Sequence, residues 1–330
     1  MTSTTIEPVL YRGFLSLVDR LPLPSLRAQR ITALIVILTQ GGIAITGSVV
    51  RVTASGLGCP TWPQCFPGSF TPVGHGEVAV LHQVVEFGNR LLTFVVVLAA
   101  AAIVLAVTRA RRRREILVYA WLMPAGTVLQ AIIGGITVLA GLVWWTVAIH
   151  MLASMLMVWL ATVLYAKVGE PDDDAETVQT IPQPLRILTA LSGLALAGTL
   201  VAGTMVTGAG PHAGDKSIEN PVPRLEIEIV SLVHLHAELL IAYLALLVGL
   251  SFGLAAVGMS AAIKKRLAVV IALVVAQSLI GLVQYFTGVP EVLVILHVAG
   301  AGACTAATAA LWAAGRTREK VPSEQSVPTA

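Results

Sequence analysis

Residues 80–107, VLHQVVEFGNRLLTFVVVLAAAAIVLAV, form an apolar run long enough to cross a lipid bilayer. A spanning helix needs about 20 such residues, because the hydrocarbon core is about 30 Å thick. The same run carries His82, Glu86 and Arg90. Ionisable side chains are costly inside a membrane and mark a candidate site there. This stretch therefore predicts both a membrane fold and polar chemistry in its interior.

The composition of the whole chain indicates a membrane protein. Its 330 residues are 56% hydrophobic and 12% charged, and the mean hydropathy is +0.84. Soluble domains carry about 25% charged residues, so an ordinary cytosolic enzyme is excluded. The net charge of +3 is small and the basic residues lie at the ends of apolar runs. We therefore expect no nucleic-acid partner.

Apolar runs of spanning length recur along the chain. They predict an all-α integral membrane protein with eight transmembrane helices. The expected spans are residues 31–51, 80–107, 117–140, 144–166, 185–207, 227–255, 267–287 and 291–313. The segment before the first span is mixed and polar, so we expect no cleaved signal peptide.

The basic residues predict the orientation. Of the 21 Lys and Arg residues, 17 fall on one side of the expected topology. Basic loops stay in the cytoplasm, so we expect a multi-pass protein of the cell membrane with both termini cytoplasmic. The expected divisions are a cytoplasmic tail (1–30), a four-helix bundle (31–166), a cytoplasmic linker (167–184), a second four-helix bundle (185–313) and a cytoplasmic tail (314–330).

An internal repeat supports the division into two bundles. A shift of 147 residues places LQAIIGGITVLAG (129–141) on AQSLIGLVQYFTG (276–288). The same shift places His150 on His297. Both repeats begin on the same side of the membrane, so we expect two pseudosymmetric bundles related by an axis along the membrane normal.

Histidines inside apolar spans are the main candidates for chemistry. His236 and His297 lie toward the outer ends of the sixth and eighth spans. Neutral imidazole is a good iron ligand, and facing helices of a bundle can hold a flat macrocycle from both sides. We expect a six-coordinate haem between these two residues. His234 lies about 200° around the helix from His236, so we expect it to be structural.

The first bundle offers an unequal pair. His150 stands at the repeat position of His297, but Asn89 stands where the second bundle has His236. Because asparagine is a poor iron ligand, we expect His150 to hold a macrocycle through one bond and to leave its other face open for reaction. His82 is the alternative second ligand, or a partner for a propionate.

Two interpretations stay open for the polar face of residues 80–107. His82, Glu86 and Arg90 are spaced by four residues and so share one face of the helix. They could form a hydrogen-bonded network that holds helices together. Alternatively, Glu86 could take a proton or stabilise positive charge, and Arg90 could pair with Glu86 or with a propionate.

The cysteines divide by location. Cys59 and Cys65 lie in the expected outer loop GLGCPTWPQC (56–65). Their spacing would suit metal or redox chemistry, but an oxidising compartment makes a disulfide the expected state. Cys304 lies within the last span, where we expect it to be packed. The glycine-rich GAGPHAG (208–214) precedes no βαβ unit, so we expect no nucleotide site.

Two other functions compete with an enzyme. A bis-histidine membrane cytochrome that only passes electrons would have equal ligands in both bundles and no need for Glu86. The asymmetry at Asn89 favours an enzyme. A transporter would have broken helices near the midplane and inverted repeats, which this sequence does not predict.

Several stretches together resemble the haem A synthase family in its actinobacterial form. They are TGSVVRVTASGLGCPTWPQC (46–65), HQVVEFGNRL (82–91) and VTGAGPHAGD (206–215). The resemblance implies eight helices in two pseudosymmetric four-helix bundles. It implies an enzyme that oxidises the C8 methyl of haem O to the formyl of haem A for cytochrome oxidase, by successive hydroxylations and loss of water. It also implies a haem b cofactor in the C-terminal bundle and the substrate haem in the N-terminal one.

The resemblance also implies ligands. His236 and His297 match the cofactor ligands, and His150 matches a substrate-side ligand. Asn89 departs from the family pattern ExxHR, in which a histidine is usual. Either His82 supplies the missing bond, or His150 holds the substrate haem alone.

The remaining implied roles concern catalysis and partners. Glu86 and Arg90 match the glutamate and arginine of the same pattern and are the catalytic candidates. Cys59 and Cys65 match the family's outer-loop disulfide. The expected partners are haem O synthase as supplier, a separate electron donor and membrane lipid, with a homo-oligomer left open.

Overall fold

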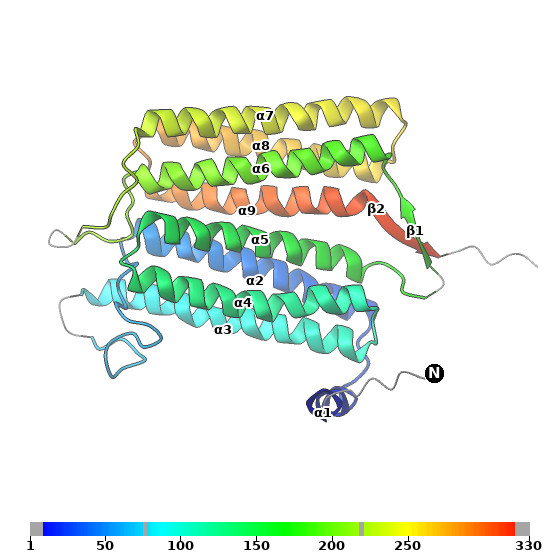
Figure 1. Cartoon of the computed structure of the whole chain (residues 1–330), viewed down its shortest axis with the longest axis horizontal. Coiled ribbons are helices and arrows are strands. Elements are labelled where there is room, and N and C mark those ends of the chain that lie inside the picture. Colours follow the sequence, from blue (N-terminus) through cyan, green and yellow to red (C-terminus); the bar gives the residue numbers. More distant parts are fainter. Residues whose placement is uncertain (1–8, 75–77, 174, 218–220, 321–330) are drawn as a thin grey trace, which may run out of the picture.

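The computed structural model describes residues 9–320 apart from 75–77, 174 and 218–220. Within that part of the chain, eight helices are long and apolar enough to cross a membrane, which confirms the predicted all-α membrane fold. They lie side by side along the long axis of the molecule (Figure 1). These helices are α2 (Leu26–Val52), α3 (Val80–Arg109), α4 (Arg114–Leu139), α5 (Trp144–Val168), α6 (Gln183–Ala209), α7 (Ile229–Ala256), α8 (Ala261–Phe286) and α9 (Glu291–Ala314).

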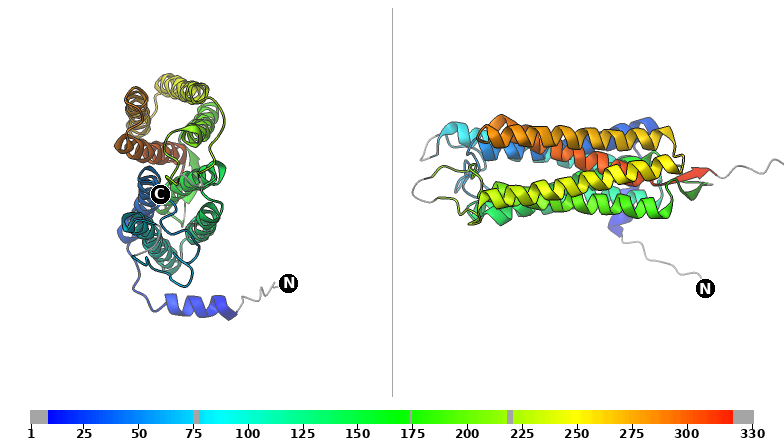
Figure 2. Two further views of the ribbon diagram at one scale, coloured as in Figure 1. Left: turned by 90° about the vertical axis from the view of Figure 1, so that its left-hand side faces the viewer. Right: turned by 90° about the horizontal axis from the view of Figure 1, so that it is seen from above.

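The helices pack in two sets, α2–α5 and α6–α9, which the end-on view of Figure 2 separates. Each set has its own apolar core, with Ile103 and Leu164 in the first and Leu250 and Leu311 in the second. Helix α9 packs against α2 and α5, and α5 also contacts α6, so these helices form the interface between the sets. The symmetry axis expected between the sets stays a prediction.

Large apolar side chains also cover the outside of the molecule. Phe94, Leu98, Phe252 and Phe286 are among the most exposed residues of their helices. In water such a surface would be unfavourable, whereas hydrocarbon chains solvate it without cost. The outward faces of the eight helices are therefore suited to contact with lipid.

The two ends of the molecule differ. One end, here called the loop end, carries the long segments 53–79 and 210–228. The other, here called the basic end, carries the connection 110–113, a further helix α1 (Val9–Val18) and two strands (Figure 1). The first and last described residues therefore lie at the same end, as expected for an even number of spans.

Helix α1 is an addition to the predicted N-terminal tail. Its Phe14 ring contacts the edge of Trp121 on α4, with 5.8 Å between ring centres. Arg111 forms an ion pair of 2.8 Å with Asp19, just after the helix. These contacts between distant parts of the chain were not visible as a pattern in residues 1–30. Residues 1–8 of that tail lie outside the described residues.

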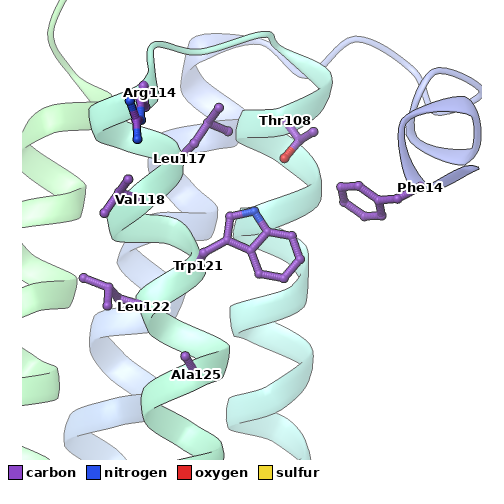
Figure 3. Close-up of a pocket in the computed structure, with 8 residues that line it drawn as sticks. All are labelled: Phe14, Thr108, Arg114, Leu117, Val118, Trp121, Leu122 and Ala125. Atoms are coloured by element: carbon purple, nitrogen blue, oxygen red, sulfur yellow. The ribbon is translucent and has the colours of Figure 1, made fainter. Parts of the chain in front are cut away.

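A groove of about 400 Å³ lies beside α1 (Figure 3). It is mostly apolar and is lined by Phe14, Thr108, Arg114, Leu117, Val118, Trp121, Leu122 and Ala125. Because it lies at the basic end, it is remote from the histidines described below, which lie near the loop end of their helices.

The predicted linker and C-terminal tail also contain local structure. Strand β1 (Ala175–Gln179) pairs antiparallel with β2 (Arg316–Lys320), with Ala175 opposite Lys320. The pairing joins segments far apart in the sequence, so no local pattern in either segment predicts it. Residues 321–330 of the expected tail lie outside the described part.

Candidate functional site

Two histidines of the second set face one another across the helix bundle. His236 lies on α7 and His297 on α9, each about two turns from the loop end of its helix. Their ring centres are 6.3 Å apart and their planes meet at 60°. The structure thus brings together the two residues that the sequence predicts as a ligand pair.

Backbone groups of α6 orient the His236 ring. Nδ1 of His236 lies 2.9 Å from the carbonyl oxygen of Thr199, which leaves Nε2 available for another partner. Ligating histidines commonly use one nitrogen for such a bond, which fixes the ring and the tautomer. One turn along α6, a Cβ atom at Gly203 would lie only 3.1 Å from Cε1 of His236. The absence of a side chain at Gly203 therefore leaves the space that the His236 ring occupies.

His297 is held by α8 in a similar way. Gln277 donates a hydrogen bond of 2.7 Å to the backbone carbonyl of His297, and a Cβ atom at Gly281 would lie 3.3 Å from its Cε1. Nδ1 of His297 is buried and has no hydrogen-bond partner among the residues that the structure describes. A buried polar atom without a partner is costly and indicates a missing ligand or water.

The distance between the two rings fits a metal held between them. A bond from a metal to an imidazole nitrogen is about 2 Å long, so two such bonds and half of each ring span roughly 6 Å. The 6.3 Å separation matches this length. His236 and His297 are therefore suited to hold a haem iron. His234 is exposed on α7 and does not share this face.

The first set holds one histidine in a matching frame. A Cβ atom at Gly134 of α4 would lie 3.3 Å from Cε1 of His150 on α5. Gln130 donates to the backbone carbonyl of His150 at 3.3 Å. Nδ1 of His150 is buried without a hydrogen-bond partner in the described ranges. The glutamine, the glycine and the histidine recur in the second set, as the internal repeat predicts.

Asn89 of α3 stands at the sequence position that the internal repeat pairs with His236. Its Oδ1 accepts a hydrogen bond of 2.6 Å from Thr46 on α2. His82, the alternative ligand, lies nearer the loop end, where its Nδ1 is 2.9 Å from the hydroxyl of Ser55. The described contacts of His82 and Asn89 are therefore with α2 and the segment that follows it.

Glu86 and Arg90 lie together beneath the segment that contains the two cysteines. Arg90 donates to Glu86 Oε1 at 2.7 Å and to the carbonyl of Cys59 at 2.7 Å. The backbone N–H of Cys59 donates to Glu86 Oε2 at 2.8 Å. Arg90 also reaches the carbonyls of Thr61 and Gln64. The face shared by residues 82, 86 and 90 is thus directed at this segment.

The cysteines form the expected disulfide, Cys59–Cys65, whereas Cys304 is a buried free cysteine. The segment between the two disulfide cysteines packs down onto the helices. A Cβ atom at Gly135 of α4 would lie 2.5 Å from the Trp62 ring, so the ring rests on the backbone of that glycine. The disulfide segment, defined as residues 55–65, therefore covers the loop end of the first set.

The family model described as "Cytochrome oxidase assembly protein" matches residues 30–311 of the chain. The chain belongs to this family. A heme A synthase of Geobacillus kaustophilus (strain HTA426) is 31% identical over 81 residues, which are 24% of this chain and 24% of the relative. A heme A synthase of Geobacillus thermodenitrificans is 29% identical over 93 residues, which are 28% of this chain and 27% of the relative.

The match to the cytochrome oxidase assembly family reaches all eight spanning helices and so includes every candidate residue named above. The similarity to the two curated relatives is more limited, because the matched stretches cover about a quarter of each. Membership in the family confirms the resemblance drawn from the sequence motifs.

Sequence reasoning missed how the disulfide segment is held. The spacing of Glu86 and Arg90 predicts a shared helix face but not what that face contacts. A signal was present in Gly58, since a Cβ atom there would lie 2.1 Å from the carbonyl oxygen of His82. Glycine at that position lets the segment approach the start of α3 closely.

Proposed function

We propose that this chain is a haem A synthase, an oxidoreductase that converts the C8 methyl group of haem O into the formyl group of haem A. The observation that carries the proposal is the facing pair His236 and His297 in the second set, against the single His150 at the matching place in the first. Two helix sets with different numbers of histidine ligands suit a protein that keeps one haem as a cofactor and presents another for reaction. Haem A for cytochrome oxidase also agrees with the family's description.

In this proposal haem b is the cofactor of the second set and haem O the substrate of the first. Oxidation of a methyl to a formyl group takes two hydroxylations and the loss of one water, and bound haem b would supply the one-electron chemistry. His236 and His297 hold the cofactor in the bundle, away from bulk water. In each hydroxylation dioxygen would be the oxidant, and two electrons and two protons would reduce its second oxygen atom to water. The sequence has no flavin, nucleotide or iron–sulfur motif, so a separate donor would supply these electrons.

We assign His150 as the protein ligand of the substrate haem. Its Nδ1 has no other partner in the described chain, and the frame of Gln130 and Gly134 holds the ring in place. Asn89 would leave the opposite face of the substrate without a strong ligand. We favour His150 alone over a pair with His82, because His82 lies seven residues, about two helical turns, nearer the loop end than Asn89.

Glu86 is the proposed catalytic carboxylate, and Arg90 is its partner. Hydrogen bonds from Arg90 and from the backbone of Cys59 fix the carboxylate in one orientation. A preoriented charge can stabilise positive charge or accept a proton without reorganising during the reaction. Arg90 also binds the disulfide segment, so it would couple the position of this segment to that of Glu86.

The protein is a multi-pass membrane protein, and we propose that it resides in the cell membrane with the basic end in the cytoplasm. The Lys and Arg residues of the basic end far outnumber those of the loop end. Haem O synthase would supply the substrate within the same bilayer.

Extraction of haems from cells that make haem O tests the proposal. Expression of the wild-type chain should lead to a formyl haem on chromatography. Glu86→Gln should keep haem b and abolish the product, whereas Glu238→Gln, which alters an exposed glutamate of α7, should leave the product unchanged. A wild-type chain that binds haem through both sets and forms no formyl haem would contradict the proposal and favour an electron-transfer cytochrome.

A further inference from the structure

Two arginines at the loop end have no negatively charged partner among the residues that the structure describes. Arg51 lies in the last turn of α2, and Arg224 lies in the segment between α6 and α7. Both donate to the carbonyl oxygen of Thr207, at 3.1 and 2.9 Å, and Arg224 also donates to the carbonyl of Gly210. Within the described chain, hydrogen bonds to backbone carbonyls therefore hold two like charges side by side.

Each of these guanidinium groups keeps an unused donor in a buried position. Nε of Arg51 and Nη1 of Arg224 are buried and have no hydrogen-bond partner in the part of the chain that the structure describes. In that same part, no ion pair joins either residue to a carboxylate. Burial lowers the pKa of Arg224, as expected for a cation that no nearby acid compensates.

Such an arrangement is unfavourable unless an anion completes it. Burying a cation without a counter-charge is costly, and a second cation beside it adds repulsion. Guanidinium groups bind carboxylates and phosphates through charge-assisted hydrogen bonds. The orphaned donors therefore indicate a site for an anionic oxygen group.

The arginines lie about one helical turn beyond the facing histidines. Gly203 of α6 abuts the His236 ring, and Thr207 is four residues further toward the loop end, a rise of about 6 Å. Arg51 comes from the first set and Arg224 from the second, so the site bridges the two. Above it the loops of the two sets are joined, since the N–H of Gly56 donates to the carbonyl of Gly214 at 2.7 Å.

We infer that Arg51 and Arg224 bind the propionate carboxylates of the haem that His236 and His297 hold. This inference rests on the proposed function for the presence of that haem. The two arginines orient the macrocycle with its carboxylate edge toward the loop end. They also attach the cofactor of the second set to a helix of the first.

Haem titration of the full-length protein, produced without haem, tests this site. One series uses haem b and the other its dimethyl ester, in which both propionates are uncharged, and the absorbance of the axially ligated iron reports binding. A charge-assisted hydrogen bond is worth about a factor of ten in affinity. Wild-type protein should bind haem b about tenfold or more tightly than the diester.

Variants assign the preference to the arginines. Arg51→Gln and Arg224→Gln should weaken haem b binding about tenfold and leave diester binding unchanged, which also shows that they are folded. Arg51→Lys should keep most of the preference because it keeps the charge. Arg27→Gln, at the opposite end of the same helix, is the matched control and should behave as wild type. If a glutamine variant binds neither haem b nor the diester, the preference of Arg51→Lys for haem b over the diester becomes the test.

Several outcomes would overturn the inference. Equal wild-type affinity for haem b and the diester would do so, as would glutamine variants that keep the preference. Added phosphatidylglycerol distinguishes a lipid phosphate as the source of the anion. If it raises the melting temperature of wild type but not of Arg51→Gln, and Arg51→Gln keeps the preference for haem b over the diester, the pair binds lipid instead. A wild-type chain that prefers haem b yet forms no formyl haem would contradict the proposed function and leave this inference intact.

Discussion

At the scale of single residues, the two facing histidines make the sharpest prediction. His236→Ala or His297→Ala removes one of the two imidazoles that stand 6.3 Å apart, so the haem should lose an axial ligand. Purified variants should lose most of the absorbance of tightly bound haem b. His234→Ala is the control, because that residue is exposed on the same helix and should retain full absorbance. Full retention in either of the first two variants would contradict the assignment.

The first set allows a second prediction of this kind. If His150 alone holds the substrate haem, His150→Ala should reduce binding of added haem O by about tenfold or more, since a metal–histidine bond is lost. His82→Ala should leave binding within about twofold, because His82 lies about two helical turns nearer the loop end than Asn89. Equilibrium titration of the purified variants measures both. The opposite result would assign the ligand role to His82.

The internal repeat made the surroundings of two histidines predictable. His150 and His297 stand at one offset, and each is framed by the glutamine and glycine that the same offset pairs. The spacing of Glu86 and Arg90 allowed their ion pair to be predicted. The contacts of Arg51 and Arg224, and those of Arg90 with the disulfide segment, could not be predicted, because these partners are backbone carbonyls of distant segments. Every residue has a backbone carbonyl group, so the residue types do not show which carbonyl will accept a hydrogen bond.

At the scale of elements, the sequence predicts the eight spanning helices. It does not predict the residues at which they begin, or the short helix and strands outside them. Twenty or so apolar residues identify a spanning helix wherever they occur, so all eight were found. The first begins at Leu26, ahead of the expected residue 31, because Ser25 caps it by accepting a hydrogen bond from the N–H of Ala28. Helix α1 and strands β1 and β2 depend on contacts with other parts of the chain, which no local hydropathy pattern contains.

The disulfide segment is the element whose loss should be felt most directly at the site. Replacing both Cys59 and Cys65 with serine removes a small closed loop and should destabilise the folded segment by about 2 kcal/mol. Without the disulfide, only the hydrogen bonds to Glu86 and Arg90 anchor residue 59, so the segment should open more often and limited proteolysis near residues 60–64 should become faster. A reducing agent should have the same effect on wild type and none on the double variant. Unchanged proteolysis after reduction would show that Arg90 and Glu86 hold the segment without the disulfide.

At the scale of the whole molecule, a charged cluster at the basic end joins segments that are distant in the chain. Arg112 and Arg113, between α3 and α4, form ion pairs of 2.6 and 2.8 Å with Asp172, which lies in the connection between the two sets. Arg318 of β2 donates to the backbone carbonyl of Asp172 at 3.1 Å. One acidic residue thus connects the first set, the connection between sets and the C-terminal strand.

The ionisation of Asp172 predicts how the stability that this charged cluster contributes depends on pH. Burial alone would raise the pKa of Asp172, but hydrogen bonds from Arg112 and Arg113 outweigh it and hold the pKa below its ordinary value. A carboxylate with a lower pKa in the folded state stabilises the protein at pH values above its unfolded pKa of about 4, and this contribution is lost as the pH falls through the folded pKa.

Asp172→Asn should therefore lower the melting temperature in detergent by several degrees at pH 7, corresponding to about 1–3 kcal/mol for a partly buried pair. Below about pH 4 the difference from wild type should shrink, because the wild-type carboxylate becomes protonated as well. Asp173→Asn changes the exposed neighbouring aspartate and should have little effect at either pH. Thermal unfolding at pH 7 and near pH 3 measures all three proteins. If the difference in melting temperature between wild type and Asp172→Asn were as large at low pH as at pH 7, the shape of the Asp172 side chain, and not its charge, would stabilise the cluster.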